Sequence, residues 1–367
     1  MKKKILHLVA AARPNFMKVA PLYHALSREE WCQPMLIHTG QHYDSSMSQT
    51  FLDDLGLPKP DVNLGVGSGP HGAQTGRVME AYEAVCLRDR PDWTVVVGDV
   101  NSTMACTLAA KKLTIPVAHL EAGLRSFDRS MPEEINRIVT DSVSDLLLTP
   151  SFDGDQNLLR EGVDAEKIIR VGNIMIDSFE MLRSTIDSRK AFERFDLVPS
   201  EYGVVTIHRP ANVDNPEILK SISEVLLSVS EKTMLFFSVH PRTAAQMKDS
   251  GIMAALDAAP GIVVSEPVGY CDFMSLVQAS RLVLTDSGGL QEETSYLRIP
   301  CITLRENTER PVTVTKGTNK LATLPEVAGL FDEILGDQWS KGERIDLWDG
   351  ETAARTVSCF RKLFSIE

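Results

Sequence analysis

Short apolar runs rich in β-branched residues alternate along this chain with longer stretches in which apolar residues recur at helical spacing. This alternation is typical of parallel strands joined by helices that cover both faces of a sheet. Predicted strands form a first series at residues 5–9, 35–38, 93–97, 117–120, 146–148 and 168–171, and a second at 204–207, 235–239, 262–264, 282–284 and 301–304. Helices are predicted at residues 17–26, 75–88, 103–112, 133–144 and 152–161. We therefore expect an α/β fold with two parallel sheets.

Chain length and one helical stretch divide these strands into two domains. At 367 residues the chain is long for a single hydrophobic core. A charged helical stretch at residues 174–195 separates the two series of strands. We expect one domain at residues 1–172 and another at 173–352, with residues 353–367 packing back on the first. A cleft between two domains is a common place for a ligand site.

Net charge limits the kinds of partner that the chain can bind. The formal net charge is −12 and the sequence pI is about 5.2. We therefore expect no nucleic acid and no anionic membrane as the main partner. Any anionic ligand must then be bound by local features.

The cysteines, the histidines and the start of the chain predict a cytoplasmic protein without a metal. Six cysteines are scattered with no C-x-x-C pair, which favours reduced thiols over disulfides or a zinc site. The histidines show no H-x-x-x-H or H-E-x-x-H spacing. The sequence contains no run of 18 apolar residues, and its start lacks the pattern of a signal peptide.

A glycine turn follows the predicted strand at residues 282–284. Asp286-Ser287-Gly288-Gly289, here called the anion turn, precedes a predicted helix. A helix start of this kind offers free backbone N–H groups and a partial positive charge, which suit a diphosphate. Glu293, further into the helix, is placed for the hydroxyls of a ribose. In the simpler alternative, Ser287 only caps the helix and the glycines only permit a tight turn.

The first predicted strand runs into a turn that carries Arg13 and Lys18 but no Gly-x-Gly-x-x-Gly fingerprint. Cations at such a turn can face a departing phosphate. Surface cations are, however, more often only solvated. The missing fingerprint argues against a bound dinucleotide.

Acidic residues follow two strands of the first series. Asp99 comes two residues after the strand at 93–97, and Glu121 directly follows the strand at 117–120. Parallel strands end at one edge of a sheet, where open α/β folds bind their ligands. Asp99 has an alternative role as a helix cap, but Asn101 and Ser102 are better placed for that role. We expect both acids at one sheet edge.

Five further residues have a functional and a structural alternative. Glu133 and Arg137 lie four residues apart after a proline, and helix physics alone explains that pattern. His208 ends a strand and precedes a polar loop, which favours a functional role. His240 ends the next strand in the same manner and is the weaker candidate. His119, at the end of another strand, is expected to be a hydrogen-bonded packing residue.

Carboxylates, a histidine and a diphosphate site together suit a reaction at a sugar carbon attached to a nucleoside diphosphate. If that reaction inverts C2, two routes are open: transient oxidation by a bound nicotinamide, or loss and re-addition of the diphosphate. The missing dinucleotide fingerprint favours elimination, which needs no cofactor. One acid or histidine would remove the C2 proton while the anion turn stabilises the departing nucleotide.

Several motifs occur in an order that matches one known family. They are Ala12-Arg13-Pro14-x-x-x-Lys18, Gly40-Gln41-His42, Gly98-Asp99, His119-Leu120-Glu121-Ala122-Gly123-Leu124-Arg125, Pro132-Glu133-Glu134-x-Asn136-Arg137, His208-Arg209, Thr285-Asp286-Ser287-Gly288-Gly289-x-Gln291-Glu292-Glu293 and Glu309-Arg310-Pro311. On these motifs the chain resembles the non-hydrolysing UDP-N-acetylglucosamine 2-epimerases over nearly its whole length.

The resemblance implies two Rossmann-like doubly wound domains that face a cleft, as in the GT-B fold, and a homodimer. It also implies interconversion of UDP-N-acetylglucosamine and UDP-N-acetylmannosamine through 2-acetamidoglucal and UDP. Carried over by motif position, the acid/base set is Asp99, Glu121, Glu133 and His208, with Arg137 in support. The UDP contacts carried over in the same way are Arg13, Lys18, Phe273, Ser287, Gly288, Gly289, Glu293 and Arg310.

Two departures from the family pattern keep related activities open. After Gln41-His42 the run Tyr43-Asp44-Ser45-Ser46-Met47-Ser48 resembles a second subgroup, for which allosteric activation by substrate is in doubt. Residues 210–214 also differ from the pattern that follows the histidine elsewhere. The alternatives are a 2-epimerase of UDP-2,3-diacetamido-2,3-dideoxy-glucuronic acid, a hydrolysing epimerase that releases N-acetylmannosamine, a GT-B glycosyltransferase and a nucleotide-sugar sensor.

Overall fold

A computed structural model of the chain describes residues 2–40 and 52–366. The chain divides into two compact units: unit 1 is Met1–Met181 with Asp346–Glu367, and unit 2 is Leu182–Ile345. Helix α7 (Ile174–Arg189) begins in unit 1 and ends in unit 2. The predicted domain boundary precedes this helix.

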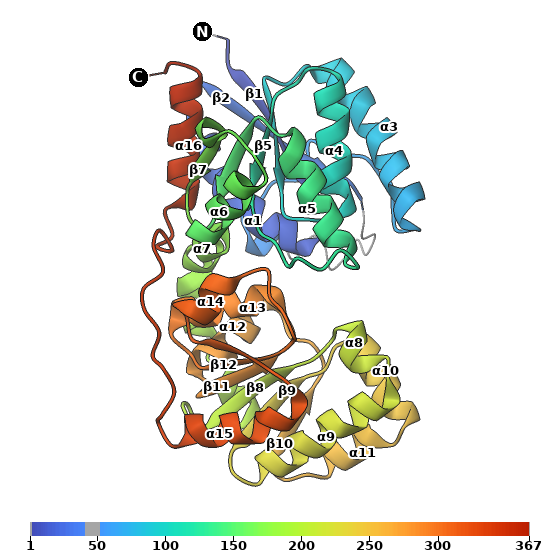
Figure 1. The fold of residues 1–367 in the computed structure, drawn as a ribbon, viewed down its shortest axis with the longest axis vertical. Helices are drawn as coiled ribbons and strands as arrows, with labels where there is room; N and C mark the ends of the chain where they lie inside the picture. The colour runs from blue at the N-terminus through green and yellow to red at the C-terminus, as the bar shows by residue number, and fades with distance from the viewer. Residues whose placement is uncertain (1, 41–51, 367) are drawn as a thin grey trace. The chain divides into compact units, whose positions relative to one another are not determined.

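Unit 1, whose strands β1, β2, β5 and β7 are labelled in Figure 1, is built on a parallel sheet of seven strands in the order β3-β2-β1-β4-β5-β6-β7. The strands are β1 (Lys4–Ala10), β2 (Cys32–His38), β3 (Val62–Asn63), β4 (Trp93–Val97), β5 (Val117–Leu120), β6 (Leu146–Thr149) and β7 (Ile168–Arg170). Strands β4 and β5 have the predicted bounds, because their short runs are mostly apolar and buried. The two-residue strand β3 is too short to show a periodic pattern.

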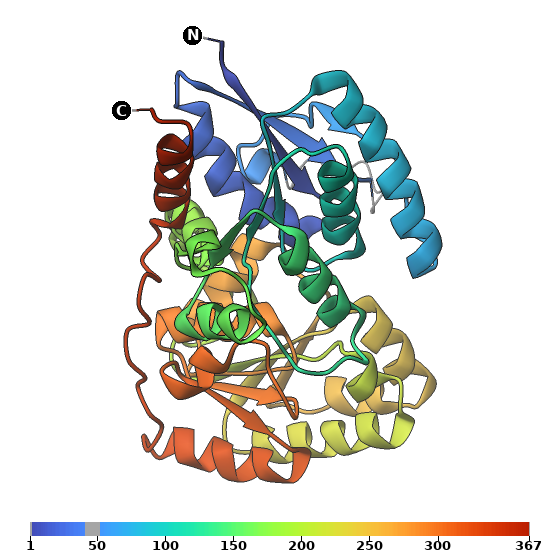
Figure 2. The ribbon, with the colours of Figure 1, turned by 45° about the horizontal axis from the view of Figure 1, so that its top comes forward.

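Helices cover both faces of this sheet. They are α1 (Arg13–Ser27), α3 (His71–Asp89), α4 (Asn101–Lys112), α5 (Pro132–Val143), α6 (Phe152–Arg160) and α16 (Thr352–Leu363), with the 3-10 turn η1 (Ala165–Lys167). Helix α1 begins four residues before the predicted position, because Pro14 lies in its first turn, where proline is tolerated. Figure 2 shows α16, from the C-terminal end, lying beside α1.

Unit 2 is built on a parallel sheet of six strands in the order β10-β9-β8-β11-β12-β13. The strands are β8 (Tyr202–Thr206), β9 (Met234–Ser238), β10 (Ile262–Ser265), β11 (Leu282–Thr285), β12 (Cys301–Leu304) and β13 (Asn319–Ala322). Strand β13 is not among the predicted strands, because its sequence begins with Asn319 and Lys320 and has no continuous apolar run.

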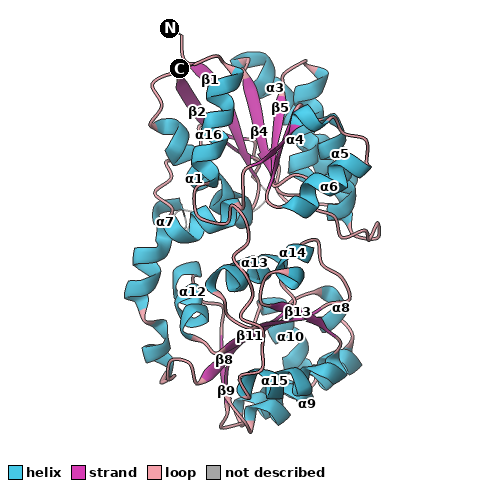
Figure 3. Cartoon of the chain, turned by 60° about the vertical axis from the view of Figure 1, so that its left-hand side comes forward, coloured by secondary structure: helices cyan, strands magenta, loops and turns pink. Residues whose placement is uncertain are grey.

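The helices of unit 2 again lie on both faces of the strands (Figure 3). They are α8 (Pro210–Val213), α9 (Pro216–Ser230), α10 (Pro241–Asp249), α11 (Ile252–Asp257), α12 (Tyr270–Ala279), α13 (Gly288–Leu297), α14 (Pro311–Thr315) and α15 (Val327–Leu335), with 3-10 turns η2 (Ala191–Phe195) and η3 (Leu324–Glu326). The predicted α/β class with two Rossmann-like sheets is confirmed.

Buried apolar side chains fix each sheet to its helices. In unit 2, Phe237 of β9 and Phe331 of α15 belong to one cluster of fully buried side chains. In unit 1, Tyr82 of α3 packs with small residues of α4 such as Ala105 and Ala109. Burial of one large apolar side chain contributes about 1.5–3 kcal/mol. These clusters hold the strand ends, and the loops that follow them, in place.

A helix that spans a membrane needs about 20 mainly apolar residues. Among residues 2–40 and 52–366, no helix is both long enough and apolar enough to do so.

Candidate active site

Glu121 lies directly after β5, at the edge of the sheet in unit 1 where the strands end. Its backbone φ is +76°, in the left-handed region that costs a non-glycine residue of the order of 1–3 kcal/mol. The side chain is buried, and its carboxylate accepts a hydrogen bond from Nζ of Lys18 in α1. Strain and burial at one carboxylate are typical of a functional position. Lys18 is therefore placed as the counter-charge of Glu121.

Gly98 leaves room for this pair. Its φ is +71°, and a Cβ atom built there would lie 3.5 Å from Lys18 Nζ and 3.6 Å from Glu121 Oε2. The same Cβ would lie 3.3 Å from Nδ2 of Asn15, which donates a 3.0 Å hydrogen bond to the Val97 carbonyl. A side chain at residue 98 would thus strain the backbone and press on Asn15, while its Cβ would be in ordinary contact with the ion pair.

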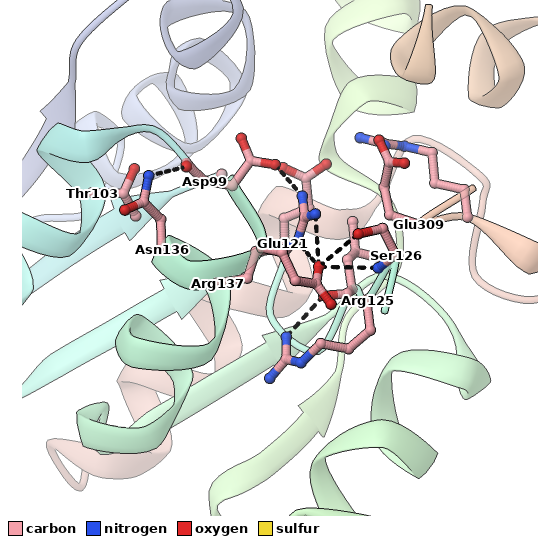
Figure 4. A network of polar contacts seen from close by, with 12 residues as sticks. Asp99, Thr103, Glu121, Arg125, Ser126, Asn136, Arg137 and Glu309 are labelled. Carbon is pink, nitrogen blue, oxygen red and sulfur yellow. Dashed lines mark hydrogen bonds and ion pairs between the residues drawn. The ribbon is translucent and has the colours of Figure 1, made fainter. Parts of the chain in front are cut away.

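Asp99 follows β4, which is paired with β5 so that Val97 lies beside Leu120. Both predicted acids therefore lie at one edge of this sheet. The Asp99 carboxylate accepts a hydrogen bond from the Arg137 guanidinium, and the Asp99 carbonyl accepts one of 2.9 Å from Asn136 Nδ2. Figure 4 shows Asn136 and Arg137 of α5 directed toward Asp99. Helix α5 thus positions Asp99 by its backbone and its side chain.

Arg137 is shared between Asp99 and Glu134. Its Nη2 donates a 2.8 Å hydrogen bond to Glu134 Oε2, and the same carboxylate accepts from the backbone N–H groups of Ser126 and Phe127 at 3.0 and 2.9 Å. Burial alone would raise the pKa of Glu134, but these donors hold it below its ordinary value. Glu134 therefore joins Arg137 to the loop after β5. Glu133 lies beside it in α5 and is half-buried.

A buried network of His119, Asp141 and Arg125 lies next to this edge of the sheet. Both ring nitrogens of His119 are engaged, Nδ1 with Asp141 Oδ1 at 2.6 Å and Nε2 with the Gly98 carbonyl at 2.9 Å. The other carboxylate oxygen of Asp141 accepts from Arg125 Nη1 at 2.7 Å and from the Gly123 N–H at 3.1 Å. Burial would raise the pKa of Asp141, yet His119 and Arg125 hold it low. His119 is the hydrogen-bonded packing residue that the sequence predicts.

In unit 2 the anion turn begins where β11 ends. Ser287 occupies the N-cap position of α13, but its side chain makes no capping hydrogen bond. The alternative in which Ser287 serves only as a cap is therefore not supported. A Cβ atom at Gly288 would lie 2.7 Å from Glu309 Oε1, whereas one at Gly289 would meet nothing within 4 Å. The missing side chain of Gly288 lets Glu309 and Arg310 pack closely against the turn, whereas the space next to Gly289 is open.

Two arginines and two carboxylates pack beneath Gly288. Arg310 pairs with Glu309 at 2.5 Å and with Glu292 at 2.8 Å, and Arg305 pairs with Glu309 at 2.7 Å. Burial would raise the pKa of Glu309, but the two arginines hold it well below its ordinary range. Because the charges balance within the cluster, an anion at the start of α13 would be attracted mainly by the backbone N–H groups of that helix.

His208 lies two residues after the end of β8, which pairs with β11. Its Nδ1 lies 3.1 Å from Asp286 Oδ1, and its side chain is 40% exposed. Asp286 itself is fully buried. The first residue of the anion turn therefore contacts the histidine and is not accessible to a ligand.

Glu293 lies in α13 and is buried. Its Oε1 accepts a 2.6 Å hydrogen bond from the hydroxyl of Tyr270, the first residue of α12. The pKa of Glu293 is raised to about 7, chiefly by burial. The hydrogen bond from Tyr270 lowers this pKa, and the nearby carboxylate of Glu292 raises it. Phe273, in the same helix as Tyr270, is half-buried.

The candidate residues thus form one group in each unit. Arg13, Lys18, Asp99, Glu121, Glu133 and Arg137 lie in unit 1, and His208, Phe273, Ser287, Gly288, Gly289, Glu293 and Arg310 lie in unit 2. Arg13 is exposed at the first residue of α1. Gln41, His42 and residues 43–48 lie outside the described residues. The contacts of Asn136, Asp141 and Tyr270 were not predicted, because their partners Asp99, His119 and Glu293 lie far from them in the sequence. The contact of Glu134 with Arg137 was not predicted, because it depends on the direction of a side chain within α5.

Comparison with known proteins gives a consistent result. The sequence profile of the family described as UDP-N-acetylglucosamine 2-epimerase matches residues 24–361. A UDP-N-acetylglucosamine 2-epimerase of Methanocaldococcus jannaschii is 44% identical over 323 residues, which are 86% of this chain and 87% of that protein. A UDP-2,3-diacetamido-2,3-dideoxy-D-glucuronate 2-epimerase of Pseudomonas aeruginosa is 41% identical over 322 residues, covering 87% of this chain and 88% of that protein.

Solved structures agree with the fold. The crystal structure of the Methanocaldococcus jannaschii UDP-GlcNAc 2-epimerase in complex with UDP-GlcNAc and UDP superposes with a TM-score of 0.88 and 40% identity, covering 98% of this chain and 99% of that one. The lipopolysaccharide outer core galactosyltransferase WaaB has a TM-score of 0.55 at 12% identity, with 99% of each chain covered, which shows a common fold alone. The GT-B-like class is thereby confirmed.

Proposed function

Because the chain belongs to the UDP-N-acetylglucosamine 2-epimerase family, we propose that it interconverts UDP-N-acetylglucosamine and UDP-N-acetylmannosamine by eliminating and re-adding UDP. The main structural support is the pair of acids Asp99 and Glu121 at the ends of the adjacent strands β4 and β5. Each acid has its own cationic partner, Arg137 or Lys18. A binding protein or a sensor would have no use for two such carboxylates.

Inversion at C2 requires a proton to leave one face of the sugar and to return on the other. In the proposed elimination a base removes the proton at C2, its electron pair forms the C1–C2 double bond, and the C1–O bond breaks toward UDP. UDP then adds back to the 2-acetamidoglucal while an acid on the opposite face delivers a proton to C2. Two carboxylates can provide both functions. We assign these transfers to the acid/base set Asp99, Glu121, Glu133 and His208, with the individual base left open.

The anion turn suits the departing nucleotide. Backbone N–H groups at the start of α13 and the Arg310 side chain are assigned to the diphosphate, since both can stabilise negative charge that develops on UDP. Gly289 borders open space at this helix start, and the Ser287 side chain makes no capping hydrogen bond there. We assign the ribose to Glu293 and the uracil to Phe273. Arg13 is assigned to the diphosphate as well, and the homodimer and the cytoplasmic location stay predictions.

Incubation with UDP-N-acetylglucosamine in D₂O, followed by NMR, tests this proposal. The expected result is deuterium at C2 together with UDP-N-acetylmannosamine at equilibrium. Free N-acetylmannosamine with an equal amount of UDP would instead indicate a hydrolysing epimerase. A substrate that shows no exchange and no product would exclude the proposed reaction.

The 2-epimerisation of UDP-2,3-diacetamido-2,3-dideoxy-glucuronic acid is a second candidate. It is favoured by the relative from Pseudomonas aeruginosa, whose identity of 41% is close to the 44% of the archaeal relative. The same D₂O experiment with both sugars separates the two. The proposal predicts a higher kcat/KM for UDP-N-acetylglucosamine, and the reverse order would favour the uronic acid.

A further inference from the structure

The carboxylate of Asp286 lies at the centre of a set of hydrogen-bond donors. Its Oδ2 accepts from the backbone N–H of Arg209 at 2.8 Å and from Asn212 Nδ2 at 3.0 Å, and both oxygens lie within 3.1 Å of the His208 N–H. Its Oδ1 also lies 3.1 Å from Nδ1 of the His208 ring. The carboxylate is fully buried, so all of its interactions are with the protein.

We propose that Asp286 is a positioning residue that keeps a proton on Nδ1 of His208 and so leaves Nε2 as the nitrogen that exchanges protons with the reactants. The inference rests on the proposed function, in which His208 belongs to the acid/base set. It adds a role for Asp286 that differs from binding of the nucleotide. Asp286 acts through His208 and does not touch the substrate.

The direction of the hydrogen bond follows from the chemistry of the two groups. An ionised carboxylate can only accept, so the ring nitrogen that faces it must carry the hydrogen. Burial would raise the pKa of Asp286, but the bonds from His208 and Asn212 and the N–H of Arg209 hold it below its ordinary value. The carboxylate therefore stays ionised near neutral pH. In neutral imidazole the second nitrogen then has a free lone pair, and this nitrogen is Nε2.

The neighbouring histidine is held in a different way. The His240 ring centroid lies 6.1 Å from that of His208, and His240 Nδ1 accepts a hydrogen bond from the backbone N–H of Arg242 at 3.3 Å. His240 is therefore oriented by the start of α10. The His208 ring instead has its 3.1 Å contact with the Asp286 carboxylate.

Asp286 also ties His208 to the anion turn. The Arg209 side chain donates from Nε to the Asp286 carbonyl at 2.9 Å, while the Arg209 N–H donates to the Asp286 carboxylate. The loop after β8 and the turn after β11 are thus joined at one residue. Because Ser287 and Gly288 follow directly, the position of the ring is fixed relative to the helix start assigned to the diphosphate.

The substitution Asp286→Asn tests the proposal with little change in shape. Its amide oxygen can replace Oδ2 and keep the bonds from Arg209 and Asn212, while its NH₂ group faces Nδ1 of His208. An NH₂ group donates, so the ring must accept at Nδ1 and carry its proton on Nε2. We expect kcat to fall at least 100-fold, with the Kd for UDP within threefold of wild type. The ¹⁵N signals of the neutral His208 ring, assigned with a His208→Gln variant, should show the change of tautomer.

Asn212→Ala is the matched control, because it removes a donor to the same carboxylate without altering the contact with the ring. Its kcat is expected within threefold of wild type, and its tautomer unchanged. The proposal is overturned if Asp286→Asn keeps wild-type kcat, if Asn212→Ala loses as much activity, or if wild-type His208 carries its proton on Nε2. If the wild-type protein does not turn over UDP-N-acetylglucosamine, the proposed function fails separately, and the ring signals alone decide the tautomer.

Discussion

The candidate residues of unit 1 and those of unit 2 handle charge in different ways. In unit 1 each of the two acids at the sheet edge is paired with a cation from a helix, Asp99 with Arg137 and Glu121 with Lys18. In unit 2 the arginines beneath the anion turn are neutralised by Glu292 and Glu309, and the helix start above them contributes backbone N–H groups. Under the proposed function, the first group would transfer protons and the second would offer backbone dipoles to the diphosphate.

This difference explains how a chain with a net charge of −12 can take a UDP-sugar as its proposed ligand. A local array of N–H groups binds phosphate without a positive surface. It also predicts that the two groups respond to different kinds of substitution. Removal of charge should affect unit 1 most, whereas added volume should affect the anion turn most.

Asp99→Asn should give the largest effect, because it keeps the shape of the side chain and removes its ability to take up a proton. We expect kcat to fall by about 10³-fold, at the middle of the range for a general acid or base. UDP binding, measured by calorimetry, should stay within threefold of wild type, because the anion turn is unchanged. Wild-type C2 exchange in this variant would remove Asp99 from the catalytic set.

Lys18→Met tests whether the buried pair in unit 1 depends on its counter-charge. Methionine has a similar length, but it leaves the Glu121 carboxylate buried without the lysine cation. Loss of one partner of a buried pair should lower the free energy of unfolding by roughly 3 kcal/mol. Lys4→Met, at the more exposed pair with Asp92, should cost less than about 1 kcal/mol. Urea titrations that give equal losses for both variants would show that burial does not distinguish the pairs.

The raised pKa of Glu293 predicts that the free energy of unfolding depends on pH, and Glu293→Gln should remove this dependence. Since burial raises its pKa from 4.5 to about 7, the folded state binds this proton more tightly than the unfolded state. Stability should therefore fall as the pH rises from about 4.5 to 7, by about 3 kcal/mol in total. The glutamine stays neutral, so the variant should gain relative to wild type across this range. Unfolding titrations at pH 5, 6, 7 and 8 that run parallel would contradict the prediction.

Gly289→Ala should give the smallest effect and tests the anion turn by volume alone. No atom lies within 4 Å of the added methyl group, and alanine favours the helix by up to about 1 kcal/mol, so the fold should be kept. The methyl group should, however, obstruct a phosphate at the helix start and raise the Kd for UDP about tenfold. Gly329→Ala in α15, which also has free space, should leave UDP binding unchanged. An unaltered Kd for Gly289→Ala would place the diphosphate elsewhere.

The α/β class and most of the strands could be predicted from the sequence, because buried strands such as β4, β5 and β12 appear as short, mostly apolar runs. Residues at strand ends could be identified for the same reason. Their partners could not, since Lys18 and Glu121 are 103 residues apart, and only the fold brings them together. The sequence predicted Lys18 as a UDP contact and did not predict its pairing with Glu121.

The different contacts of neighbouring residues in one motif cannot be predicted from the sequence. Glu133 and Glu134 are chemically identical in the sequence, but the turn of α5 directs Glu134 toward Arg137 and the loop after β5. Asp286 belongs to the anion turn by position, yet the pairing of β8 with β11 places it against His208. Side-chain direction within an element, and strand order within a sheet, are set by tertiary packing.

Detachment of UDP during turnover is the central claim, and positional isotope exchange tests it most directly. UDP-N-acetylglucosamine is prepared with ¹⁸O at the oxygen that joins C1 to the β-phosphorus and is then incubated with the wild-type protein. If UDP leaves and returns, the label moves into the non-bridging oxygens of the β-phosphate at a rate comparable with epimerisation, which ³¹P NMR detects. Epimerisation at C2 with the label kept in the bridge would contradict this mechanism.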